Sequence, residues 1–192
     1  MALTFDPAKH EYRCDGAVVP GVTEIIRAAG LAIVPPGATD WHMGRGRVVH
    51  EATALYDKND LDESSVDPEA RGFVAAYIAF RKTAGADVEI KEIETPRYNR
   101  ELRYAGTPDR YVKWRGQPAV LELKSGAPEV AHRAQTSAYQ GLITCGLRLA
   151  LYLKSDGHWS LETHKDPNDW PIFVAACSLW HFRHAHGLLE VR

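Results

Sequence analysis

The stretch YAGTPDRYVKWRGQPAVLELK, residues 104–124, decides the fold class. It predicts two strands, 104–113 and 118–124, that turn back on each other at the residues between them. We place the centre of the turn between Arg115 and Gly116. The sequence therefore predicts a β-hairpin in the middle of the chain.

This hairpin brings polar side chains of its two strands together. With the turn centred there, Asp109 lies directly opposite Glu122 and Thr107 lies opposite Lys124, at about 5 Å between Cβ atoms. Because side chains alternate along a strand, Glu122 and Lys124 share one face of the sheet. The neighbouring leucines of the second strand point to the other, buried face.

Two opposed carboxylates repel each other and destabilise the strand pair unless something neutralises them. A shared proton is one option and a bound cation is another. Lys124 supplies one positive charge, which does not balance both carboxylates. A divalent metal held by Asp109, Glu122 and a backbone carbonyl removes the repulsion, because hard cations such as Mg²⁺ prefer oxygen ligands. Since ExK is common in strands by chance, a surface hairpin with a Glu–Lys pair is the alternative.

The rest of the chain is outlined by apolar periodicity and by turn residues. Helices are predicted at 22–29, 41–58, 68–83, 129–145 and 168–186. Further strands are predicted around the Asp15-Gly16 turn and at 87–97, 148–154 and 158–164. The pattern indicates one α/β (α+β) domain over residues 1–192, in which a small mixed sheet is flanked by helices. Its parts are an N-terminal hairpin with helices (1–85), a central sheet with a helix (86–146) and C-terminal strands with a helix (147–192).

Composition argues against several classes of protein. No apolar run approaches the about 20 residues that cross a bilayer, and the N-terminus lacks the pattern of a secretory signal. We therefore expect no membrane partner and a location in the cytoplasm of the source or host cell. The formal net charge of −2 argues against a protein that passively coats DNA, but it permits an enzyme whose acidic metal ligands offset local arginines.

Three kinds of bound group are also disfavoured. The three cysteines lie far apart and form no CxxC pair, so an iron–sulfur cluster is not expected. No GxxxxGK[ST] loop is present, which disfavours the use of a nucleotide. The C-terminal histidines lack the spacing of a zinc motif; they are His164, His181, His184 and His186.

Four short motifs occur in the order that one nuclease family shows. They are Gly46 to His50 (GxxxH), Gly106 to Asp109 (GTPD), Glu122 to Lys124 (ELK) and Gln135 to Tyr139 (QxxxY). Together they resemble the signature of the PD-(D/E)xK nucleases. The resemblance is to the branch with the RecB nuclease domain, lambda-type phage exonucleases and CRISPR spacer-acquisition nucleases. It spans about residues 10–140, and the N-terminal segment is similar to phage-type members.

The resemblance implies a restriction-endonuclease-like core and a Mg²⁺- or Mn²⁺-dependent DNA nuclease, favouring an exonuclease of DNA recombination, repair or replication. It implies a metal site made of His50, Asp109, Glu122 and the carbonyl of Leu123. It implies that Lys124 positions a water, with Gln135 and Glu94 contributing to catalysis. The implied substrate contacts are Arg45, Arg47, Arg97 and Tyr139.

Several alternatives stay open at this point. The same fold serves endonucleases, junction resolvases and modules that bind nucleic acid without cutting it. Glu92 competes with Glu94 for the acidic role, and His50 can be an ordinary helix residue. Arg110 is the weakest of the candidate phosphate contacts, because it points to the face opposite Asp109. DNA is the expected partner, with a separate single-strand annealing protein or helicase as a further one, and the oligomeric state is undetermined.

Overall fold

The computed structural model describes residues 2–32 and 40–189, and for residues 40–43 it describes the backbone alone. Its centre is a five-stranded sheet in the order β10-β9-β8-β7-β4. The parallel β8–β9 pair and the antiparallel neighbours on either side make the sheet mixed. The strands are β4 (Val88–Ile93), β7 (Arg110–Trp114), β8 (Gln117–Lys124), β9 (Leu147–Leu153) and β10 (Trp159–Thr163).

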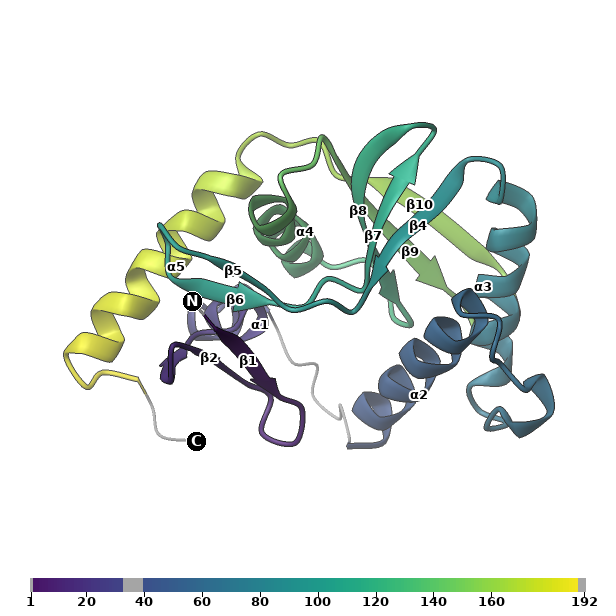
Figure 1. Cartoon of the computed structure of the whole chain (residues 1–192), viewed down its shortest axis with the longest axis horizontal. Coiled ribbons are helices and arrows are strands. Elements are labelled where there is room, and N and C mark those ends of the chain that lie inside the picture. The colour runs from purple at the N-terminus through teal and green to yellow at the C-terminus, as the bar shows by residue number, and fades with distance from the viewer. Residues whose placement is uncertain (1, 33–39, 190–192) are drawn as a thin grey trace.

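Helices cover both faces of this sheet (Figure 1). On one face, α2 (Asp40–Asp57) and α3 (Arg71–Ala84) share a core with the leucines of β8 and β9. On the other face, α4 (Val130–Ile143) packs over Val120 and is backed by α1 (Val22–Ala28) and α5 (Asp169–Ala185). The mixed sheet flanked by helices confirms the predicted fold class.

Two small sheets and a 3₁₀ turn complete the fold. The N-terminal sheet contains β1 (Leu3–Asp6), β2 (Glu11–Cys14) and β3 (Ala17–Val19), and β5 (Arg97–Asn99) pairs with β6 (Tyr104–Gly106). The 3₁₀ turn covers Glu63–Ser65. Positive φ angles of 49° at Asp15 and 84° at Gly16 fit the type I′ turn that closes tight hairpins. The hairpin predicted there is confirmed.

Two predicted strands are interrupted, and the interruptions shape the site. The segment 87–97 divides into β4 and β5, because Glu94 takes a positive φ of 46° that no strand accommodates. The strand predicted at 104–113 divides into β6 and β7, which leaves Thr107 to Asp109 outside any ladder. At the end of β6, Gly106 leaves no room for a side chain, since a Cβ atom there would lie 2.7 Å from the Tyr139 ring.

The predicted helices are present, with small differences at their ends. The third helix starts at Arg71 rather than at residue 68, and the predicted apolar face of Phe73, Ala76, Tyr77 and Phe80 is buried. Trp41, at the predicted start of the second helix, has a side chain outside the described residues. No described helix is both long and apolar enough to cross a membrane.

Candidate active site

The β7–β8 hairpin has the register that the sequence predicts. Its pairs run from Trp114–Gln117 to Arg110–Leu121, around a turn with positive φ at Arg115 and Gly116. Asp109 and Glu122 follow directly beyond the last pair, and the Asp109 N–H donates to Glu122 Oε1 at 2.9 Å. The predicted juxtaposition of the two carboxylates is confirmed.

The predicted pairing of Thr107 with Lys124 is wrong, because the ladder ends at Arg110. The Thr107 hydroxyl lies 2.9 Å from the Tyr12 hydroxyl instead. Tyr12 belongs to β2, so this contact brings the N-terminal sheet against the segment that leads to Asp109. Sequence reasoning missed Tyr12 as a neighbour of the site; the only signal was the alternation of the segment around it.

Each carboxylate has one oxygen fixed by the main chain and one that faces a cation. Glu122 Oε1 accepts from the Asp109 N–H, and Asp109 Oδ2 accepts from the Leu123 N–H at 2.8 Å. The other oxygens are Asp109 Oδ1, 3.1 Å from His50 Nδ1, and Glu122 Oε2, 3.1 Å from Lys124 Nζ. Both residues are buried, with 7% of Asp109 and 1% of Glu122 exposed.

His50 changes the charge argument made from the sequence. From the sequence, only Lys124 was available to balance the charges of Asp109 and Glu122. In the structure, the imidazole of His50 also lies beside Asp109. A protonated His50 and Lys124 together balance both carboxylates. The repulsion alone therefore does not demand a metal ion, and the case for an ion depends on how the donor atoms are arranged.

The ionisation of the four groups is strongly perturbed. Burial and then the charge of Asp109 raise the pKa of Glu122 to about 7. Burial opposes ionisation of Asp109, but the charge and hydrogen bond of His50 outweigh it and hold the pKa of Asp109 well below its ordinary value. Burial likewise opposes the charged forms of His50 and Lys124, yet the nearby carboxylates raise the pKa of both. Such clusters of perturbed groups are typical of functional sites.

The donor types, two carboxylates, an imidazole and a carbonyl, are ones that a divalent cation can bind. Asp109 Oδ1 and His50 Nδ1 are 3.1 Å apart, which is a hydrogen-bonding distance, so His50 would have to release its Nδ1 proton before it could coordinate a metal. The Leu123 N–H points toward Asp109, and the carbonyl of a strand residue faces the same edge as its N–H, so the Leu123 carbonyl faces this site. Within residues 2–32 and 40–189, no group of three or more His, Cys, Asp or Glu side chains is arranged to hold a metal ion. An ion at this position would therefore need the side chains to shift, or would need the Leu123 carbonyl and water as further ligands.

Gln135 and Tyr139 reach the site from α4. Gln135 Nε2 donates to the Tyr139 hydroxyl at 3.3 Å. Tyr139 is only 5% exposed, and burial, followed by the negative charge of Glu122, raises its pKa well above the ordinary value. The hydrogen bond thus places Gln135 beside Tyr139.

Arg45 and Arg47 lie at the N-terminal part of α2. The Arg45 guanidinium stacks 4.8 Å from the centre of the Phe73 ring and donates to the carbonyl of Ser125 at 3.4 Å, directly after Lys124. Arg47 is exposed. The structure does not support a spacer role for Gly46 above His50, since a Cβ atom there would first meet Ser125 Oγ at 3.9 Å.

The acidic residues before Asp109 separate into two roles. Glu92 forms an ion pair with Arg97, which engages the arginine predicted as a substrate contact. Glu94 is exposed, and its N–H donates to the carbonyl of Asp109 at 3.1 Å. Of the two, Glu94 is the one joined to the catalytic segment through its backbone.

Other polar side chains from the sequence are engaged in contacts within the fold. Arg110 is not a phosphate contact: its side chain is completely buried and pairs with Asp57. Tyr104 is a core residue whose hydroxyl donates to the carbonyl of Ala138. His164 hydrogen-bonds Thr136, and His181 contacts the carbonyl of Leu102.

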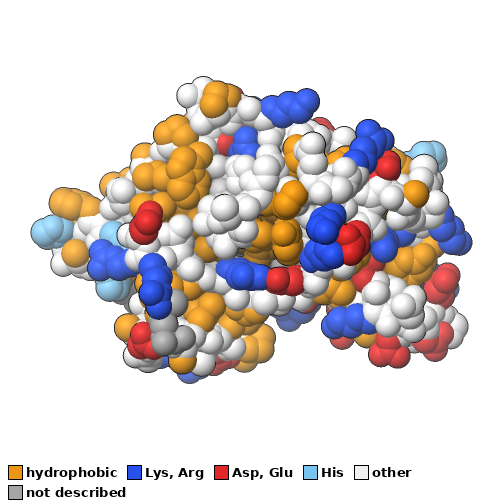
Figure 2. All heavy atoms as spheres, turned by 45° about the horizontal axis from the view of Figure 1, so that its top comes forward, with side chains coloured by type: hydrophobic (Ala, Val, Ile, Leu, Met, Phe, Trp, Pro, Cys, Tyr) orange, Lys and Arg blue, Asp and Glu red, His pale blue; other side chains and the backbone are white. Residues whose placement is uncertain are grey.

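A hollow of about 480 Å³ lies between the β2–β3 turn, the β5–β6 hairpin and α5. Its lining combines basic and aromatic side chains, including Arg100, Arg103, Tyr98, His181 and His184. On the face of the molecule that Figure 2 shows, basic and acidic side chains are interspersed. This face therefore has no continuous positive surface.

Comparison with known proteins adds little. No family model matches the chain, and no curated protein matches it. Among solved structures, the crystal structure of SSO0001 is similar over 82% of this chain and 72% of that chain, with 16% sequence identity and a TM-score of 0.43. A likeness at that level supports no argument about fold or function.

Proposed function

We propose that this chain is a metal-dependent deoxyribonuclease that hydrolyses phosphodiester bonds. The observation that carries the proposal is the buried chain of contacts in which His50 pairs with Asp109, the Asp109 N–H donates to Glu122, and Glu122 pairs with Lys124. The order of motifs around these residues supports the same activity. An exonuclease acting in recombination, repair or replication is the form we favour, by analogy with the family that the motifs resemble.

The proposed roles of the site residues are metal binding, positioning of water and contact with DNA. Asp109, Glu122, His50 and the Leu123 carbonyl would hold Mg²⁺ or Mn²⁺, with Glu94 close to the Asp109 backbone. When bound, such a cation lowers the pKa of a water ligand and stabilises negative charge on a phosphate. Lys124 orients the attacking water and stabilises the charge that develops on the phosphate oxygens. Arg45, Arg47 and Arg97 are the proposed contacts to the DNA backbone. Tyr139, the further contact that the motifs imply, is too buried for this, with 5% of its surface exposed.

A module that binds DNA without cutting it is the main alternative. It would have no need for the buried group of Asp109, Glu122, His50 and Lys124, because burying charged groups costs free energy. The alternative makes a distinct prediction, namely DNA binding that neither needs nor uses a divalent cation.

The first experiment is digestion of end-labelled linear DNA with Mg²⁺, Mn²⁺ or EDTA. We expect cleavage with either metal and none in EDTA, and the order in which labelled fragments appear gives the polarity. Closed circular DNA serves as the comparison, since its cleavage identifies an endonuclease or resolvase of the same fold. Cleavage in EDTA at the full rate would overturn the metal-dependent mechanism.

Replacing Lys124 separates its role from metal binding. In Lys124→Met, we expect kcat to fall by about 10²- to 10³-fold, since the charge that develops at the phosphate loses its ammonium partner. Mn²⁺ binding, measured by calorimetry, should persist because the Asp109 and His50 donors remain. A variant that loses Mn²⁺ binding in parallel with kcat would show that Lys124 serves the metal site instead.

The basic hollow predicts a salt-dependent contact with DNA. The double variant Arg100→Glu, Arg103→Glu should weaken binding of oligonucleotides in Ca²⁺ and reduce the dependence of log Kd on log salt by about 1 to 2. Arg115→Glu is the control, with the weakening of binding compared per unit of charge changed, because Arg115 is an exposed arginine in the turn of the β7–β8 hairpin. Equal weakening in both proteins would mean that the hollow contributes only general charge.

A further inference from the structure

We propose that Arg110 and Asp57 are positioning residues that fix α2 against the catalytic strand and thereby hold His50 at Asp109. This inference rests on the proposed function, since it concerns the geometry of the same metal site. It assigns a role to a buried charge network that the cleavage mechanism itself does not use. The argument starts from the contacts of one guanidinium.

Arg110, the first residue of β7, joins this strand to α2. Its Nε donates to Asp57 Oδ2 at 2.7 Å, and one terminal nitrogen donates to Thr53 Oγ1 at 3.3 Å, both on α2. The other terminal nitrogen donates to the carbonyl of Asp109 at 2.7 Å. The guanidinium therefore ties α2 directly to the backbone of the residue that carries the first carboxylate.

Asp57 also contacts two residues of α3. Its Oδ2 also accepts from the Tyr77 hydroxyl at 2.5 Å, and its Oδ1 is 3.3 Å from Arg81 Nε; both partners belong to α3. The Arg110 and Asp57 side chains are completely buried. Neither charge can rotate out to water, so the pair defines one position for α2 relative to β7.

The spacing of residues on α2 carries this position to the metal site. His50, Thr53 and Asp57 are separated by three and four residues, so they lie on one face of the helix. At the C-terminal end of this face, Asp57 contacts Arg110. About two turns earlier, His50 Nδ1 contacts Asp109 Oδ1. Arg110 thus holds the Asp109 backbone with one nitrogen and the helix of His50 with its others.

A buried ion pair often stabilises a protein no better than apolar side chains of the same size would. Its benefit here is positional, because a ligand pair 3.1 Å apart tolerates little movement of the helix. Residues that orient metal ligands from behind typically affect metal affinity or activity by about 10- to 100-fold. We expect Arg110 and Asp57 to fall within that range.

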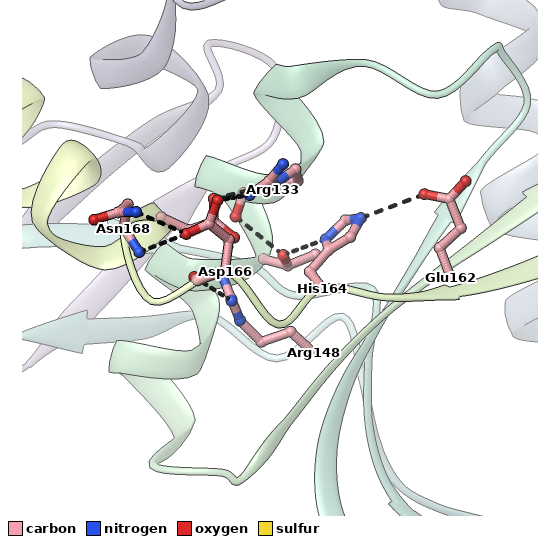
Figure 3. Close-up of polar contacts among 8 residues, drawn as sticks. Arg133, Arg148, Glu162, His164, Asp166 and Asn168 are labelled. Carbon is pink, nitrogen blue, oxygen red and sulfur yellow. Dashed lines mark hydrogen bonds and ion pairs between the residues drawn. The ribbon is translucent and has the colours of Figure 1, made fainter.

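The chain contains a comparable arginine–aspartate pair on two other elements, β9 and α5. Arg148 Nη1 donates to Asp169 at 2.8 Å, and its other terminal nitrogen donates to the backbone carbonyl of Asp166 at 3.0 Å. Figure 3 shows this network with Arg133 and His164, between the end of β10 and α5. Like Arg110, Arg148 is a buried arginine that binds one aspartate and one carbonyl.

The experiment compares Arg110→Lys and Asp57→Asn with Arg148→Lys and Asp169→Asn. Each protein is measured for Mn²⁺ Kd by calorimetry, for kcat and KM on labelled DNA, and for unfolding in urea. We expect Mn²⁺ affinity and kcat to fall by about 10- to 100-fold in the first pair, with KM little changed. In the control pair both should stay within about twofold, even where the loss of stability is the same.

Milder variants keep the test open if Arg110→Lys does not fold. Thr53→Val and Tyr77→Phe each remove one hydrogen bond of the network without burying an unpaired charge. Equal changes of Mn²⁺ Kd and kcat in site and control variants of equal stability would overturn the inference. Wild-type values of Mn²⁺ Kd and kcat in every variant of the Arg110–Asp57 network would also overturn the inference.

A metal-free measurement distinguishes failure of the inference from failure of the proposed function. In EDTA, amide hydrogen exchange over residues 44–57 should be faster in Arg110→Lys than in Arg148→Lys. If the wild-type chain neither binds Mn²⁺ nor cuts DNA, the proposed function fails, while exchange still reports whether Arg110 fixes α2. Unchanged exchange over these residues would contradict the inference whatever the activity.

Discussion

Asp109→Ala is expected to reduce Mg²⁺-dependent cleavage by about 10³-fold or more, because it removes a metal ligand worth several kcal/mol in the transition state. The substitution also removes the carboxylate that accepts from the Leu123 N–H and pairs with His50. Cleavage of end-labelled DNA under single-turnover conditions measures the loss. Binding of DNA in Ca²⁺ or EDTA should change little, because the arginines are untouched.

Asp169→Asn provides the comparison for this prediction, since Asp169 is a buried carboxylate outside the site. It should retain cleavage as long as the protein is folded at the assay temperature. Persistent cleavage in Asp109→Ala would show that the active site is misassigned. Loss of DNA binding together with cleavage would instead point to misfolding, which unfolding in urea detects.

Without divalent cations, Glu122 is expected to lower the stability of the protein, relative to Glu122→Gln, as pH rises from about 5 to 8. The pKa of Glu122 is raised to about 7 in the folded chain from its ordinary 4.5, so its contribution is present below 4.5 and is lost as pH rises through 7. His50, whose pKa is also raised, acts in the same direction. The lowered pKa of Asp109 acts only at more acidic pH.

The size of this effect is on the order of 3 kcal/mol, from a pKa shift between 4.5 and about 7. Urea unfolding of the wild type and of Glu122→Gln in EDTA measures it as the difference between the two pH profiles. The difference is needed because His132, whose pKa burial lowers to about 4, acts in the opposite direction in both proteins. Mn²⁺ should stabilise the protein more at pH 8 than at pH 5, because it binds the deprotonated ligands. A pH profile that Glu122→Gln leaves unchanged would show that Glu122 is not the group responsible.

The turn residues and the apolar alternation of the hairpin were sufficient to predict that Asp109 and Glu122 lie side by side. The turn at Arg115-Gly116 fixes the register of β7 against β8, and register places Asp109 beside Glu122 without further information. Alternation then puts Leu121 and Leu123 into the α2–α3 core and leaves Glu122 on the other face. These relations depend on residues close in sequence, which is why they could be predicted.

Contacts between distant segments could not be predicted in the same way. Nothing local shows that the imidazole of His50 would supply a second positive charge at Asp109, or that the Tyr12 hydroxyl would reach Thr107. Arg110 looked like a surface charge, because the sequence does not reveal Asp57 as its buried partner on α2. The break between β4 and β5 also depends on a distant contact, because the Glu94 N–H at this break donates to the Asp109 carbonyl.

The most direct test of the account is anomalous diffraction from crystals grown or soaked with Mn²⁺. We expect one strong peak within about 2.3 Å of Asp109 Oδ1 and of a Glu122 carboxylate oxygen, with the Leu123 carbonyl as a further ligand and the peak absent in Asp109→Ala. Ordered Mn²⁺ elsewhere in the crystal, with Asp109 still paired to His50 and no peak between the carboxylates, would contradict the shared metal site.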